Sequence, residues 1–279
     1  MSPRGWVLPA LAVALLLCVL PAVLLAGARS APEIPPPVTA APVSPSPAEP
    51  LPSPTPSPIP SLPPSPIPSP PPVSPFTGMP TDLGAPVLSV KIDNAKAARP
   101  QTGLALADLV YVEPVEGGIS RLLAVYQSHF PPLVGPVRST RLTDLQLLAN
   151  FGRPALAFSG AAAQITALVA RAPVLDVSEE KQPRSYRRDR RKRMPHNLYG
   201  DTFLLRRGGQ PPRDIGFRFG PTPPGGRSVP GTNVRYRATD IGVQWVPTEA
   251  RWVISMDGAP FIAAAGPRPG AATVVLQRV

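Results

Sequence analysis

Residues 90–141 read VKIDNAKAARPQTGLALADLVYVEPVEGGISRLLAVYQSHFPPLVGPVRSTR, and this stretch decides the fold. Its apolar runs have the length and composition of strands, yet polar side chains of both signs stand at the ends of the runs. Burying an unpaired charge costs several kcal/mol or more, so packing alone does not require charges at these places. We therefore expect these side chains to pair with one another or to face a ligand. They are Asp93, Asn94, Arg99, Glu113, Glu116, Arg121, Arg138 and Arg141.

On either side of this stretch, strand-like and helix-like segments alternate, which predicts an α/β domain. Glu116-Gly117-Gly118 predicts a hairpin turn, so we expect a mixed sheet and not a purely parallel one. We expect Ser139 or Thr140 to be the N-cap of the first helix, and Ser159 to cap the second rather than to act as a nucleophile. Strands are predicted at 86–92, 108–115, 119–130, 154–160 and 173–177, helices at 140–150 and 161–171, and a short helical turn at 104–107.

The last part of the chain has a different character. Residues 208–232 are rich in Gly, Pro and Arg, which predicts a linker. Residues 233–279 hold short apolar runs that predict strands, and the last of these runs, 272–279, ends the chain. Because an apolar strand with an open edge invites aggregation, we expect this domain to be truncated. The predicted fold is an α/β N-terminal domain with a mixed sheet and helices, followed by a small, truncated β-rich C-terminal domain.

The first 75 residues are not expected to contribute a core. Residues 1–28 carry one Arg followed by an apolar run, which is typical of a signal peptide or a signal anchor, and cleavage stays open. Residues 29–75 form a Pro/Ser-rich tract with 21 prolines in positions 32–75, which predicts a disordered, extended stalk. We expect an extracytoplasmic protein of the cell envelope, either membrane-anchored through its N-terminal segment or secreted.

Composition excludes some sites and favours certain partners. Cys18 is the only cysteine and lies in the N-terminal apolar run, and with two histidines a His-rich zinc site is excluded. The net charge of +11 favours an anionic partner, such as an anionic cell-wall polymer or a lipid-linked phosphate. Residues 184–193 supply seven basic side chains and one Asp to this charge. We expect no nucleic-acid partner, because a secreted protein rarely meets nucleic acid.

Several motifs together resemble the YerB-like family of bacterial lipoproteins. The resemblance implies two consecutive domains of unknown function, at 76–207 and in part at 233–279, and a cell-surface setting, but no established activity. Cys18 follows Leu16-Leu17 and lacks the small residue of a lipobox, a departure from the family that argues against lipidation. The motifs are IDN at 92–94, ARPQTGLALAD at 98–108, VEPVEGGISR at 112–121, GPVRSTR at 135–141 and MPHNLYG at 194–200.

Three arginines indicate an anion site. Arg121, Arg138 and Arg141 stand where strands meet loops or a helix, and guanidinium groups bind phosphate or carboxylate in a fork. The start of the helix after Arg141 would add free N–H groups. We expect Asp93 and Glu116 to order the arginines. The remaining expected ligand-binding residues are Asn94, Arg99 and Asn197.

Catalysis would have to use few groups. His196 is the candidate general acid or base, and the alternative is a structural histidine bonded to a backbone carbonyl. Asp93 and Glu116 are the candidate catalytic carboxylates. With Asn94 and Glu113 they also offer oxygen ligands for a divalent cation. Their spacing matches no known metal loop, so neither a metal site nor a cofactor is predicted.

Three functions stay open. The first is a binding module that holds an anionic envelope ligand in the arginine pocket. The second is a metal-assisted phosphotransferase or hydrolase acting on lipid-linked phosphopolymers, because the pattern around Arg99, Asp108 and Arg138 loosely resembles the LytR-CpsA-Psr phosphotransferases, which use Mg²⁺. The third is a structural scaffold without a ligand, in which the charges form salt bridges and Arg138 and Arg141 pair with Glu113 and Glu116.

Overall fold

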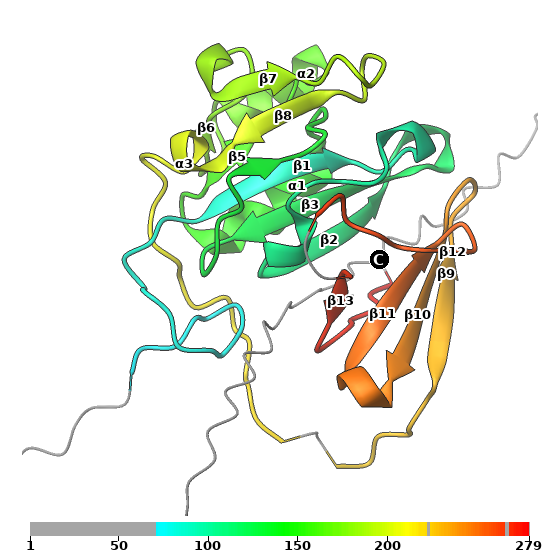
Figure 1. Ribbon diagram of the computed structural model, residues 1–279. Coiled ribbons are helices and arrows are strands. Elements are labelled where there is room, and N and C mark those ends of the chain that lie inside the picture. The colour runs from blue at the N-terminus through cyan, green and yellow to red at the C-terminus, as the bar shows by residue number, and fades with distance from the viewer. Residues whose placement is uncertain (1–70, 222–223, 266–267, 279) are drawn as a thin grey trace, which may run out of the picture. The chain divides into compact units, whose positions relative to one another are not determined.

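The computed structural model describes residues 71–221, 224–265 and 268–278, whose helices and strands are shown in Figure 1. The predicted signal segment at 1–28, with Cys18, and residues 29–70 of the predicted stalk lie outside these ranges. Within them, no helix is both long and apolar enough to cross a membrane. The described residues form a five-stranded sheet, a second sheet near the C-terminus and a short three-stranded sheet.

The five-stranded sheet has the order β2-β3-β1-β5-β6, and it is mixed, as predicted. β3 lies antiparallel between β1 and β2, whereas β5 runs parallel to β1 and β6. Gly117 and Gly118 form the predicted turn between β2 and β3 with φ of 76° and 77°, a conformation that glycine adopts without strain. The strands are β1 (Leu88–Asp93), β2 (Leu109–Pro114), β3 (Ser120–Tyr126), β5 (Ala155–Ala157) and β6 (Leu175–Asp176).

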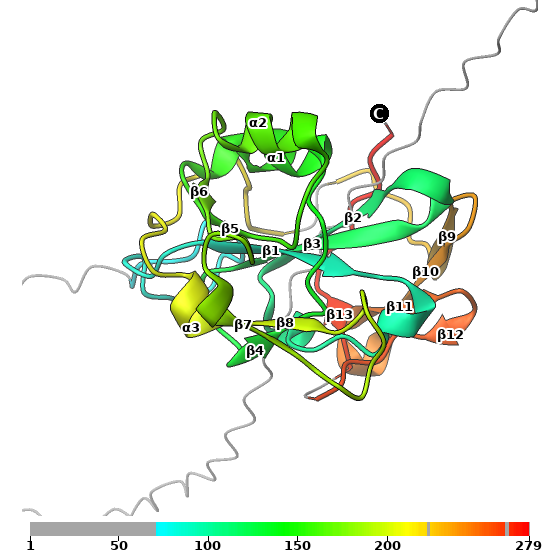
Figure 2. The ribbon, with the colours of Figure 1, turned by 90° about the horizontal axis from the view of Figure 1, so that it is seen from above.

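The two faces of this sheet have different coverings, because successive side chains of a strand point to opposite faces. Helices α1 (Leu142–Leu148) and α2 (Ala163–Val169) cover one face, as Figure 2 shows. Leu148 of α1 is buried there in one apolar cluster with Leu123 of β3. On the opposite face, Val90 belongs to a second cluster that includes residues of both other sheets.

The three-stranded sheet was not predicted from the sequence. It has the order β4-β8-β7 and lies opposite the helices (Figure 2). The basic composition of residues 184–193 concealed β7, in which Tyr186 packs against the core while Arg187 and Arg188 are exposed. The elements here are β4 (Leu133–Val134), β7 (Tyr186–Arg188), β8 (Leu198–Asp201) and the short helix α3 (Thr202–Leu205).

The predicted helix caps are wrong. Arg141 is the N-cap residue of α1, and the Thr140 hydroxyl donates 2.8 Å to the Asp144 carboxylate instead of accepting a backbone N–H. Asp144, inside the first turn, accepts the backbone N–H of the N-cap residue Arg141 at 2.7 Å. Ser159 precedes α2 by too many residues to cap it, and its carbonyl accepts a 3.0 Å hydrogen bond from the Ser139 hydroxyl.

The C-terminal sheet is antiparallel and has the order β12-β11-β10-β9, with β13 also paired to β11. Ile241 and Ile254 of this sheet share an apolar cluster with Val110 and Leu122, and the described residues belong to one compact unit. The strand predicted at 272–279 is wrong for 272–278, because β10, β12 and β13 already occupy both edges of β11. The strands are β9 (Gly231–Arg235), β10 (Asp240–Val246), β11 (Arg251–Met256), β12 (Ala259–Pro260) and β13 (Gly270–Ala271).

Replacing Leu148 with Ala tests the helix-covered core. Leu148 is fully buried, so its truncation should lower the free energy of unfolding by about 2–5 kcal/mol through lost burial and a residual cavity. Leu142→Ala on the same helix is the matched control. Leu142 is 45% exposed, and its truncation should cost about 1 kcal/mol or less. Urea unfolding followed by circular dichroism measures both, and equal losses would contradict this packing of α1.

Candidate functional site

The helix-covered face of the five-stranded sheet changes from apolar to charged at the carboxyl ends of β1 and β5. Asp93 on β1 and Glu113 on β2 both lie opposite Arg121 on β3, so the three side chains share one face. Lys91 lies two residues before Asp93 and therefore on the same face. Ligands of α/β sheets bind outside the carboxyl ends of the strands, and this charged end is the candidate site.

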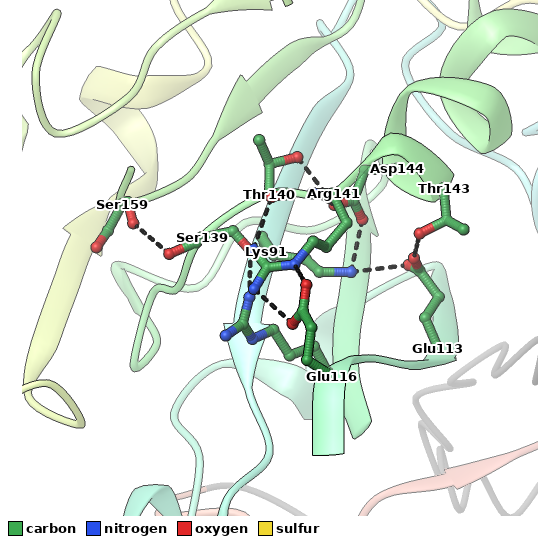
Figure 3. Close-up of polar contacts among 10 residues, drawn as sticks. Lys91, Glu113, Glu116, Ser139, Thr140, Arg141, Thr143, Asp144 and Ser159 are labelled. Atoms are coloured by element: carbon green, nitrogen blue, oxygen red, sulfur yellow. Dashed lines mark hydrogen bonds and ion pairs between the residues drawn. The ribbon is translucent and has the colours of Figure 1, made fainter. Parts of the chain in front are cut away.

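Lys91 is the centre of this arrangement, and the sequence analysis missed it. Its side chain is fully buried, and its ammonium lies 2.6 Å from the Asp144 carboxylate and 3.0 Å from that of Glu113 (Figure 3). Thr143 donates a 2.5 Å hydrogen bond to the other Glu113 oxygen. One buried cation thus joins β1, β2 and α1. The signal for it was the alternation Ser89, Lys91, Asp93, which marks a polar row on one face of a strand.

The pKa of Glu113, which shares a single buried ammonium with Asp144, is raised to about 7. The largest cause is burial, which disfavours the ionised form, and the second is repulsion by Asp144. Lys91 and the Thr143 hydroxyl act in the opposite direction. Near neutral pH the cluster therefore carries a proton that is only weakly held.

Asp144 connects this buried cluster to the arginines. Its second oxygen accepts the backbone N–H of Arg141 at 2.7 Å as well as the Thr140 hydroxyl. The first turn of α1 is thus capped from within, and the free N–H groups expected to bind an anion are not all available. The anion site must rest on the side chains that Asp144 positions, chiefly Arg141.

Arg141 and Glu116 form a bidentate pair. Two parallel hydrogen bonds of 2.7 Å join the guanidinium to the carboxylate, which agrees with the pairing expected in the scaffold interpretation (Figure 3). These bonds lower the pKa of Glu116 to about 2. The Glu116 side chain is nevertheless 70% exposed and stands on the two-glycine turn. Solvent competes for such a carboxylate, and a ligand can replace it at low cost.

Arg121 has no comparable partner. It is 6% exposed, and one of its nitrogens donates 2.9 Å to the Ser139 carbonyl, to which Arg141 also donates at 3.4 Å. Its buried Nε lacks a hydrogen-bond partner, and no carboxylate of the described residues lies within ion-pair distance. Burial, then the neighbouring Arg141 and Arg138, lower the pKa of Arg121. Two guanidinium groups therefore converge on one carbonyl oxygen with too little negative charge between them.

A hollow of about 540 Å³ opens beside Arg141, whereas Arg121 and Arg138 are not among its walls. Its walls include Glu116, Ser139, Arg141 and Gly160. It lies between the β2–β3 turn and the segment that leads into α2, so its polar wall carries the exposed side of the Arg141–Glu116 pair. A small anionic group has room to reach Arg141 here.

Asp93 binds two bases at once. One carboxylate oxygen lies 2.7 Å from Nδ1 of His196 and 3.1 Å from Nε of Arg138, and the other accepts the Ala95 N–H. Arg138 thus pairs with Asp93, and not with Glu113 as the scaffold interpretation had it. The Arg138 Nε is at ion-pair distance but lacks hydrogen-bond geometry. His196 is 23% exposed in its side chain, so its ring lies at the edge of the site.

Three of the predicted ligand-binding residues instead hold the surrounding loops. Asn94 bonds to Gln101 and Ser120. Arg99 donates to the Asn94 carbonyl and pairs with Asp257 at 2.8 Å. Asn197 donates to the carbonyls of the loop before it, at Asp189 and Lys192.

Arg99, Asp108 and Arg138, the residues of the phosphotransferase pattern, do not form one site in this structure. Asp108 precedes β2 and accepts the backbone N–H groups of Gln127 and Ser128 after β3, at the end of the hairpin opposite Glu113. Asp93, Glu113 and Glu116 each face a different base, and no group of three metal-ligating side chains is found in the described ranges. The oxygen ligands considered for a divalent cation are therefore directed to bases.

Comparison with known proteins gives the family. Residues 76–212 match the model of a family described as protein of unknown function (DUF3048), N-terminal domain. These residues, just under half of the chain, belong to the YerB-like family. A stretch of 72 residues is 46% identical to "Putative lipoprotein YerB" of Bacillus subtilis (strain 168), covering 24% of this chain and 22% of that relative. The aligned stretch thus spans about a fifth of the length of this relative.

A solved structure of the YerB-like family has the same fold. The crystal structure of the YerB protein from Bacillus subtilis matches with a TM-score of 0.57 and 22% identity, over 73% of this chain and 71% of that chain. The family resemblance taken from the motifs is confirmed, and so is the α/β fold class predicted from the alternation of strand-like and helix-like segments.

Glu113→Gln should change the pH dependence of stability. Folded Glu113 keeps its proton up to about pH 7, above the ordinary value of 4.5, so the folded state binds more protons between these values. Stability contributed by this group is present at low pH and falls as the pH rises, by at most ~1.4 kcal/mol per unit. Gln cannot ionise. The free energy of unfolding of the variant should therefore rise relative to that of the wild type as the pH rises from about 4.5 to about 7.

Urea unfolding at a series of pH values measures the effect. Glu180→Gln is the matched control, because Glu180 is exposed, and its curve should run parallel to the wild type. If the Glu113→Gln curve also ran parallel, the buried carboxyl would not carry the proton assigned to it.

Proposed function

We propose that this chain is an extracytoplasmic binding module of the bacterial cell envelope that holds an anionic group, phosphate or carboxylate, at Arg121, Arg138 and Arg141. The observation that carries the proposal is the buried, carboxylate-free Arg121 beside Arg141. Burying a charge without an ion-pair partner is unfavourable, and an anion bound between the guanidinium groups would relieve this cost.

Charge counting supports the same conclusion. Three guanidinium groups face two carboxylates, those of Asp93 and Glu116, so the site has an excess positive charge even with His196 neutral. Glu116 then acts as an internal substitute for the ligand, because its exposed carboxylate occupies the fork of Arg141. A ligand phosphate would displace Glu116 and approach Arg121 at the same time.

The cellular setting comes from two separate observations. A relative is named "Putative lipoprotein YerB", and this name supports an extracytoplasmic setting in the cell envelope for this chain. In this chain, the apolar segment within 1–28 and the Pro/Ser-rich tract at 29–75 have the composition of a membrane signal and a spacer. An anionic cell-wall polymer and a lipid-linked phosphate are the partners that this setting offers.

Arg121→Met separates binding from scaffolding. Met has similar bulk and no charge, so a residue buried without an ion pair should be replaced with little loss or even a gain in stability. Thermal unfolding of the full chain in neutral detergent, with pyrophosphate as the ligand, should show stabilisation of the wild type by about 2.7 kcal/mol at ~100 times the dissociation constant. This stabilisation should disappear in Arg121→Met.

Two further variants sharpen the experiment. Glu116→Gln frees Arg141 and should raise the affinity for pyrophosphate up to about fivefold, the equivalent of a 1 kcal/mol surface pair. Arg171→Gln, which removes one exposed charge elsewhere, should leave the affinity nearly unchanged. A strong loss of stability in Arg121→Met, together with no response to pyrophosphate in the wild type, would favour the scaffold function.

A second candidate, an envelope hydrolase or phosphotransferase, is favoured by the short contact between His196 and Asp93. A carboxylate on Nδ1 orients a histidine so that Nε2 can act as a base or acid. If the bound anion is a reacting phosphate, His196→Gln should lower turnover of a phosphodiester substrate by 10²-fold or more without weakening its binding. Equal turnover by the wild type and by His196→Gln would exclude His196 as the acid or base, and no turnover by the wild type would leave binding alone as the function.

A further inference from the structure

A second basic region lies on the outer face of the three-stranded sheet, apart from the arginine cluster. Two hollows of about 380 and 410 Å³ adjoin there and share Leu133 of β4 and Arg187 of β7 as walls. The first continues past Arg190 and Lys192, and the second continues past Arg184. Together they form a trough, called here the β7 trough, that crosses the sheet with basic side chains at both ends.

Most of the positive charge on the β7 trough is unpaired. Of the seven bases at 184–193, Arg188 pairs with Glu179 and Arg191 with Asp189. The Lys192 ammonium donates to the carbonyls of Ala98 and Pro100. In the part of the chain that the structure describes, no acid lies within ion-pair distance of the remaining four, all of them exposed: Arg184, Arg187, Arg190 and Arg193.

The loop that carries several of these arginines is held by hydrogen bonds. The Asn197 side chain donates to two carbonyls of the loop and accepts from Arg188 at 3.1 Å, and the Asp189 N–H donates to the Asn197 carbonyl. Lys192 anchors the same loop to residues 98–100. The backbone that carries Arg187 and Arg190 is therefore held in place beside the trough.

We propose that the β7 trough binds a linear phosphodiester polymer, with successive phosphates meeting Arg184, Arg187 and Arg190. Guanidinium forks match phosphate oxygens, and charges spread along a trough suit a chain better than a single ion. A membrane surface is less well matched, because the arginines line a concave wall and Met194, 69% exposed, is the one large apolar side chain exposed on this loop.

The test uses the full chain in neutral detergent and a labelled poly(glycerol phosphate), with binding followed by fluorescence anisotropy. The wild type should bind the polymer more tightly than glycerol 3-phosphate. Its affinity should fall by about 20- to 40-fold between ~50 and ~200 mM salt, the dependence for about three neutralised phosphates. Arg187→Gln/Arg190→Gln should weaken polymer binding at least tenfold.

Matched controls separate the β7 trough from net charge and from the arginine cluster. Arg171→Gln/Arg227→Gln removes the same charge from exposed arginines that line neither hollow, and should change the affinity less than threefold. Arg141→Gln should leave polymer binding intact.

Equal losses of polymer affinity in Arg187→Gln/Arg190→Gln and in Arg171→Gln/Arg227→Gln would overturn the proposal. So would stronger binding, through the same arginines, to vesicles of phosphatidylcholine with phosphatidylglycerol than to the polymer.

Discussion

The buried ammonium of Lys91 is the interaction on which the rest of the candidate site depends. It is fully enclosed between Glu113 and Asp144, and a charge in such a place persists only with partners at short distance. Through these two contacts it fixes the end of β1 to β2 and to the first turn of α1. Asp144 then caps Arg141, and Arg141 meets Glu116 on the turn that follows β2. The positions of Arg141 and Glu116 therefore depend on the buried ammonium of Lys91.

The alternation of residue types predicted the strands and helices of the five-stranded sheet, because one face of each element is apolar. It also predicted that polar side chains gather at the strand ends, and it named Asp93, Arg121, Arg138 and Arg141. It did not predict which base meets which acid. Arg138 pairs with Asp93 because β1 and the segment after β4 run side by side, a long-range contact that spacing along the chain does not reveal.

The errors share one physical origin, which is that tertiary contacts override local composition. Lys91 lies in the strand predicted at 86–92 and Asp144 in the helix predicted at 140–150, yet each is the other's buried partner, which neither local pattern reveals. The basic run at 184–193 hides a strand because β8 supplies its hydrogen bonds. The apolar run at 272–278 is not a strand, because both edges of β11 were already occupied.

The asymmetry among the three arginines argues for a ligand more strongly than their number does. If the charges served only to hold loops, each guanidinium would end on a carboxylate, as Arg141 and Arg138 do. Arg121 is the most buried of the three and has only a carbonyl oxygen, which it shares with a second cation. A carbonyl dipole compensates a buried charge less well than a carboxylate does. A fold that tolerates this deficit, while the exposed carboxylate of Glu116 holds the neighbouring Arg141 beside a hollow, is better suited to exchange that carboxylate for a ligand than to close permanently.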